Sequence, residues 1–226
     1  MIIGVIAVFA ILTFVSWTLI SKKAFRFIFG TISLLGLILS VFATSEHMFN
    51  YYGVKKDIQT TKTQIFSATG NKTPAGILIA EPINKGSKVD AYVYSKDASA
   101  TDTKVDAPKL DKTMKVVKVG GEKAYRVLKV TKYKYNNSFF KFLFGVFEMD
   151  KVVTKTEVTY QLPETWTTAS KEELTAMQKA IATLTPDSDP AVLLLAQDMK
   201  KAMAEGDLKK AAANNISLIQ ATNRPK

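Results

Sequence analysis

Two long uncharged stretches open the chain, and both have the length of a membrane-spanning helix. Residues 2–20 contain no charged side chain, and residues 27–44 form a second uncharged run. As helices with a rise of about 1.5 Å per residue, both runs approach the thickness of the hydrocarbon layer of a bilayer. The pattern predicts a transmembrane helical hairpin over residues 1–50, with spans of about 2–20 and 27–44.

Two other interpretations of the opening stretch remain. It could be a cleaved signal peptide or signal anchor followed by one span, or a hairpin buried inside a soluble fold. Against a signal peptide, no Lys or Arg precedes the apolar run, the run is longer than a usual signal core, and no small-x-small cleavage site follows it. A basic turn and a second apolar run follow instead.

The orientation of the hairpin is predicted from the basic residues of its turn. Lys22, Lys23 and Arg26 lie in the short loop between the spans, and such loops are enriched in Lys and Arg on the cytoplasmic side. Lys55 and Lys56 favour the opposite orientation, but they belong to a long domain, whose charges count for less. We therefore expect a multi-pass protein of the cell membrane, with the N-terminus and the C-terminal domain extracytoplasmic.

Small residues recur every four positions on the second span. Gly36, Ser40 and Thr44 lie on one stripe of a helix, where another helix backbone can approach closely. The stripe fits packing either against the first span or against a partner membrane protein.

Residues 57–165 have the pattern of an extracytoplasmic β-rich domain. Thr, Val, Tyr and Ile alternate with polar residues in short runs, and turn residues interrupt them at short intervals. Gly120 and Gly121 separate two alternating runs, which predicts a β-hairpin with a two-residue turn. The chain is thus expected to be an α+β membrane protein with a small antiparallel β barrel or sandwich.

A phenylalanine-rich segment, residues 138–148, lies between two predicted strands, Tyr125–Tyr135 and Lys151–Leu162. It is too short to span a bilayer as a helix. Its phenylalanines could enter the outer leaflet, bind a partner, or seal the core of the domain. The candidate membrane or partner contacts are Phe139, Phe140, Phe142, Phe144 and Phe147.

Residues 168–223 are predicted to form amphipathic helices. Ser170 and Glu173 have the spacing of a capping box. Asp189 before Pro190 begins a second helix, and Gly206 before Asp207 ends it and begins a third. Since short helices are unstable alone, they should pack on each other or on the β-domain.

The net charge of +11 is unevenly distributed. Residues 58–135 carry 15 Lys and Arg against 7 Asp and Glu, whereas residues 136–226 carry 11 of each. A basic surface on an exported domain fits anionic lipid headgroups or an anionic envelope polymer. Lysines that keep a β-domain soluble are the alternative. Nucleic acid is not an expected partner, because no recognition motif is present.

Catalytic and metal-binding patterns are absent from the sequence. The chain has no cysteine and one histidine, His47, which excludes thiol catalysis, His/Cys metal clusters and a Ser-His-Asp set in the β-domain. His47 is expected to be a polar side chain at the membrane interface. The acidic residues of the polar segment 96–111 lack calcium-loop spacing, so we expect a solvated loop or edge; they are Asp97, Asp102, Asp106 and Asp111. We expect no cofactor, no metal and no catalytic residue.

The layout resembles a family of small two-span membrane proteins from lactobacilli and related Gram-positive bacteria, catalogued as a domain of unknown function. The resemblance covers the first two thirds of the chain. It rests on the apolar N-terminus, the Ser21-Lys22-Lys23 turn, and the phenylalanine-rich insertion before Thr165-Trp166-Thr167. It implies a bacterial plasma-membrane location and supplies no activity.

These observations favour a non-enzymatic, membrane-tethered accessory or binding protein. Its expected partners are the lipid bilayer and either another integral membrane protein or an anionic envelope polymer. The alternative is a cell-envelope enzyme that uses carboxylates on a sugar or lipid-linked substrate, since such carboxylate pairs come from distant sequence positions.

Overall fold

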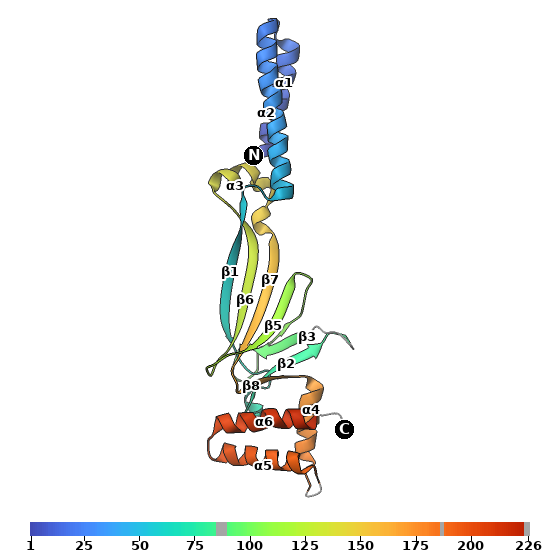
Figure 1. Ribbon diagram of the computed structural model, residues 1–226, viewed down its shortest axis with the longest axis vertical. Helices are drawn as coiled ribbons and strands as arrows, with labels where there is room; N and C mark the ends of the chain where they lie inside the picture. Colours follow the sequence, from blue (N-terminus) through green and yellow to red (C-terminus); the bar gives the residue numbers. More distant parts are fainter. Residues whose placement is uncertain (85–89, 186–187, 224–226) are drawn as a thin grey trace. The chain divides into compact units, whose positions relative to one another are not determined.

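The computed structural model describes residues 1–84, 90–185 and 188–223 (Figure 1). The chain forms two compact units. Unit 1 contains Met1–Gln59 and Val130–Lys155, and unit 2 contains Thr60–Lys129 and Thr156–Lys226. The fold is α+β, with two apolar helices, two four-stranded sheets and three C-terminal helices.

Unit 1 begins with two paired helices, α1 (Ile2–Leu19) and α2 (Lys23–Asn50), which lie side by side in Figure 1. Both are long and apolar enough to cross a membrane, and most of their residues are not buried by the protein itself. Large apolar side chains on both helices are exposed, among them Phe14 (67%), Phe27 (66%) and Leu39 (64%). A helix from the core of a soluble protein would bury these groups.

Small residues line the contact between the two helices. Gly30 lies directly beneath the Trp17 ring, so a side chain there would collide with the indole. The buried hydroxyls of Ser33 and Ser40 donate to carbonyls one turn earlier, at 2.7 Å to Phe29 O and 2.6 Å to Gly36 O. These two buried hydroxyls therefore have protein partners and need no water.

The first sheet has the strand order β1 (Val54–Ile65), β6 (Ala124–Tyr135), β7 (Val153–Leu162), β5 (Lys112–Lys118). The expected β-hairpin across Gly120 and Gly121 is wrong, because β7 lies between β5 and β6. Instead β5 pairs with β7 in parallel, from Lys112 opposite Thr156 to Lys118 opposite Leu162. The glycine pair forms a connection in which Gly121 has a positive φ of 112°.

The second sheet belongs to unit 2 and is also mixed. Its order is β4 (Thr103–Asp106), β3 (Asp90–Ser95), β2 (Gly76–Pro82), β8 (Trp166–Ala169), and a short 3-10 helix, η1 (Gly70–Lys72), precedes β2. β2 is antiparallel to β3 and parallel to β8. Among the described strands, the two sheets are open and form no closed barrel, and neither is purely antiparallel as the sequence suggested.

Three helices complete unit 2: α4 (Lys171–Ala182), α5 (Pro190–Ala204) and α6 (Leu208–Thr222). Their starts confirm the predicted caps. Ser170 and Glu173 form a reciprocal capping box, and the side chains of Asp189 and Asp207 accept backbone N–H groups of the first turns.

The core of unit 2 has two layers of apolar contacts on opposite faces of β2. Ile77 and Ile79 pack against the helices, together with Leu174, Met177 and Ala196. Leu78 points to the other face, where it packs with strand residues of the first sheet such as Val158 and Tyr160. The alternation along β2 thus explains why helices cover one face of this strand and the first sheet covers the other.

Candidate functional site

The phenylalanine-rich segment folds as helix α3 (Ser138–Phe144) in unit 1, followed by the 3-10 turns η2 (Gly145–Phe147) and η3 (Met149–Lys151). The Asn137 side chain caps α3, because its Oδ1 accepts the N–H of Phe140 at 3.0 Å. The helical spacing then divides the phenylalanines between two faces.

The inner face of this segment closes the core of unit 1. Phe144 is fully buried, and Phe140 and Phe147 pack around it with Tyr135 and Ile2. The Tyr135 hydroxyl donates to Phe144 O at 3.0 Å. Because the Phe144 side chain is enclosed by the protein, it can contact neither a membrane nor a partner, and Phe144 is no longer a candidate contact residue.

The outer face carries two exposed aromatic side chains. Phe139 and Phe142 are 64% and 62% exposed. Two large apolar groups on a seven-residue helix form a small, concentrated apolar surface. These two residues are the surface part of the predicted contact set.

His47 lies inside the same core, at the C-terminal end of α2. The expectation of a polar side chain at the membrane interface is wrong, since the residue has no exposed surface. Its ring stacks on Phe144, with centroids 4.2 Å apart, and its Nδ1 lies 2.6 Å from Tyr52 O. Because that partner is a carbonyl, Nδ1 carries the proton. The histidine therefore connects the C-terminal end of α2 to α3, through Phe144, and to the turn after α2, through Tyr52.

Gly53 allows α3 to approach that turn closely. Its φ of 81° lies in the left-handed region, and a side chain there would collide with the Phe140 ring. The rings of Tyr52 and Phe140 meet edge to face, with centroids 5.3 Å apart. The turn after α2 is thus shaped to receive α3.

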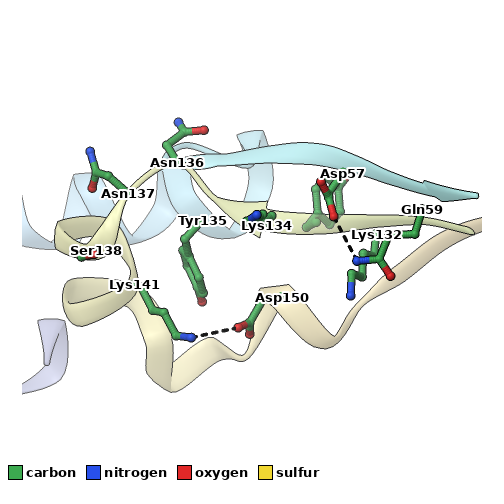
Figure 2. Close-up of a pocket in the computed structure, with 11 residues that line it drawn as sticks. Asp57, Gln59, Lys132, Lys134, Tyr135, Asn136, Asn137, Ser138, Lys141 and Asp150 are labelled. Carbon is green, nitrogen blue, oxygen red and sulfur yellow. Dashed lines mark hydrogen bonds and ion pairs between the residues drawn. The ribbon is translucent and has the colours of Figure 1, made fainter.

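A cavity of about 490 Å³ opens beside α3, between the ends of β1 and β6 and the segment that contains η3 (Figure 2). Its charged lining residues are Asp57, Lys132, Lys134, Lys141 and Asp150, and its neutral polar ones include Gln59, Asn136, Asn137 and Ser138. Figure 2 shows Lys141 and Asp150 reaching toward each other, with Nζ and Oδ2 at 3.8 Å. Asp57 accepts from the Gln59 amide at 3.3 Å.

Two lysines of this cavity have no carboxylate partner in the described part of the chain. Lys132 and Lys134 are two residues apart on β6, so both side chains leave the same face of the strand. Together with Lys141 they outnumber the two carboxylates. The cavity, which Tyr133 and Tyr135 also line, therefore has an excess of positive charge, which suits an anion.

The remaining predicted residues lie in the helical hairpin. Gly36 packs against the Phe9 ring, and Ser40 is buried, whereas Thr44 is half-buried and donates to Ser40 O at 2.8 Å. Lys22 and Lys23 are exposed at the turn. Arg26 has a structural contact there, since its Nε donates to Ile20 O at 2.8 Å and caps the end of α1.

A second polar cluster, in unit 2, was missed in the sequence. Asp106 is nearly buried, which corrects its assignment to a solvated loop. Its Oδ2 accepts from Arg126 Nε at 2.8 Å and from the Tyr160 hydroxyl at 2.7 Å, and Lys112 binds Oδ1. Burial opposes ionisation, but the three donors outweigh it and hold the pKa of Asp106 below its usual range. Burial, and then the bond to Asp106, raise the pKa of Tyr160.

This cluster is a cross-link between strands rather than a ligand site. Its members come from β4, β5, β6 and β7, and every charge is paired within it. Within the described residues, no group of three or more His, Asp or Glu side chains is placed to hold a metal ion.

Comparisons with known proteins give one family. No curated protein and no solved structure matches the chain. A family model described as a domain of unknown function (DUF4811) matches residues 22–179, a stretch from the hairpin turn through α2, both sheets and α3 into α4. The match covers more than half of the sequence, and the chain therefore belongs to the DUF4811 family.

Proposed function

We propose that this protein is a non-enzymatic accessory or binding module, anchored in the cell membrane by α1 and α2. The observation that carries the proposal is the exposure of large apolar side chains along both helices, which the protein itself leaves uncovered. Lipid would cover these groups, and the small polar residues between the helices already have internal partners. A bacterial plasma membrane, implied by the resemblance described above, belongs to this proposal.

The segment around α3 would rest on the membrane surface. Phe139 and Phe142 are suited to enter the acyl region, and the exposed ion pair of Lys141 with Asp150 would then lie at the level of the headgroups. The basic turn with Lys22, Lys23 and Arg26 supports a cytoplasmic turn. The N-terminus, the β-strands and the C-terminal helices would then be extracytoplasmic.

Lipid is the partner that the exposed aromatic pair favours. The small residues of α2 already pack against α1, so a partner membrane protein would have to bind the remaining, bulkier faces of the two helices. An anionic polymer would not explain why two phenylalanines are exposed on α3. The carboxylate-enzyme alternative is weaker, because Asp57 and Asp150 of the cavity already interact with Gln59 and Lys141.

Alkaline carbonate extraction of membranes tests the anchor. The full chain should stay in the pellet after extraction at high pH, as an integral protein does, and should dissolve only in detergent. Release into the supernatant would contradict membrane-spanning helices. A peripheral protein from the same cells controls for complete extraction.

A further inference from the structure

The lysine-bearing cavity beside α3 has the features of a headgroup site. We propose that it binds the phosphodiester of an anionic lipid whose headgroup carries hydroxyl groups, such as a phosphatidylglycerol. The inference rests on the proposed function, because the lipid must be present where α3 meets the membrane.

The charge of the cavity selects the phosphate. Lys132 and Lys134 project from one face of β6 and have no carboxylate partner in the described ranges, while Asp150 is engaged by Lys141. A phosphodiester between the two β6 lysines would gain charge-assisted hydrogen bonds without breaking an existing pair. A lipid with a cationic choline group would bring a second positive charge into a site that already has an excess.

The neutral groups of the cavity suit the remainder of such a headgroup. The Asp57 carboxylate and the Gln59 amide lie together on β1 and can accept or donate hydrogen bonds to hydroxyl groups. Asn136 and Ser138 add further hydrogen-bonding groups. A volume of about 490 Å³ is within the usual range of small-molecule sites and accommodates a glycerophosphate group.

The position of the cavity favours a lipid over a soluble phosphate ester. Ser138 and Lys141 belong both to its lining and to α3, which carries the exposed Phe139 and Phe142. When these phenylalanines enter the acyl region, the lysines of the same unit lie at headgroup depth. The acyl chains of the bound lipid would then remain in the bilayer, and only the headgroup would enter the cavity.

The test uses the full chain in nanodiscs and measures retained lipids by native mass spectrometry. In discs of phosphatidylcholine with a minor fraction of phosphatidylglycerol, the wild-type chain should retain phosphatidylglycerol selectively. The double variant Lys132→Gln/Lys134→Gln should lose about tenfold or more of this selectivity, as expected for two lysines near a membrane surface. The matched control is Lys200→Gln/Lys201→Gln on α5, which removes the same charge from unit 2 and should leave selectivity unchanged.

Each outcome decides the proposal. Equal loss in both double variants would mean that net charge alone attracts the lipid, and unchanged selectivity in the β6 variant would mean that the cavity is not the site; either result overturns it. Soluble glycerol phosphate should compete only at far higher concentration than the lipid, and equal affinity would overturn the assignment to a lipid. Incorporation into the disc is scored separately, so failure of the chain to enter discs would refute the membrane anchor instead.

Discussion

At the scale of single residues, Asp106 shows how three donors keep a nearly buried carboxylate ionised. Arg126, Lys112 and Tyr160 supply the donors, and they come from three strands besides that of Asp106. Removing the carboxylate leaves the partly buried cations Lys112 and Arg126 without their partner, which costs more than the loss of an exposed ion pair.

The Asp106→Asn variant should lower the free energy of unfolding of unit 2 by about 2–3 kcal/mol. Urea denaturation of the full chain in detergent would measure this, with Trp166 as the reporter in a Trp17→Phe background. The matched control is Asp102→Asn, whose side chain makes exposed ion pairs with Lys96 and Lys104, so its effect should stay within about 1 kcal/mol. Equal effects of the two substitutions would refute the cross-link.

The same carboxylate predicts a pH dependence. Because the pKa of Asp106 is lower in the folded protein than the value of about 3.9 in an unfolded chain, the unfolded state binds more protons between these two values. The contribution of Asp106 to stability is therefore present above about pH 5 and is lost as the pH falls toward the folded pKa. Denaturation midpoints measured from pH 6 to pH 3 should fall more steeply for the wild type than for Asp106→Asn. Parallel slopes would contradict an ionised Asp106.

At the scale of elements, α3 shows how one short helix can serve two environments. Asn137 fixes its start, and the helical period then sends Phe140 and Phe144 inward and Phe139 and Phe142 outward. The sequence left core packing and surface contact as alternatives, and the structure assigns one face of α3 to the core and leaves the other exposed.

Fluorescence quenching should detect contact between α3 and lipid. The Trp17→Phe parent is measured first, and its Trp166 emission is subtracted. The emission added by Phe142→Trp should then be quenched strongly by lipids brominated on their acyl chains. Leu194→Trp on α5 is the control, since Leu194 is similarly exposed at 59% but belongs to unit 2. Quenching of both variants to the same extent, or of neither, would argue against a lipid-facing α3.

Local signals predicted elements far better than they predicted pairing. The capping box at Ser170 and the caps at Asp189 and Asp207 were readable because each joins residues within one turn. The Gly120-Gly121 turn signal failed because β7, more than thirty residues later, inserts beside β5. The sequence of a turn does not show whether a distant strand will pair in parallel with one of its flanking strands. Mixed sheets are therefore difficult to infer from the alternation of apolar and polar residues alone.

The candidate site was predictable only in part, because its residues come from distant parts of the chain. The phenylalanines were conspicuous in the sequence, but the cavity beside them needs Asp57 on β1, Lys132 on β6 and Asp150 in η3, which meet only through the fold. Similarly, Asp106 looked like one of several acidic residues in a polar segment. Its partners Arg126 and Tyr160 are 20 and 54 residues away.

At the scale of the whole molecule, the central claim is that lipid surrounds α1 and α2. The two helices present apolar side chains that the protein leaves exposed, and Lys22, Lys23 and Arg26 gather at the start of α2, beside the turn between the helices. The positive-inside tendency then predicts that unit 2 lies on the opposite side of the membrane from this turn.

Thiol labelling of intact cells tests this claim most directly, because the chain has no cysteine of its own. Single variants Ser21→Cys in the turn and Ser99→Cys in unit 2, both exposed positions, would be treated with a membrane-impermeant maleimide before and after permeabilisation. The account predicts that Ser99→Cys is labelled in intact cells and Ser21→Cys only after permeabilisation. The reverse pattern would refute the orientation, and identical labelling of both positions would refute a membrane-spanning hairpin.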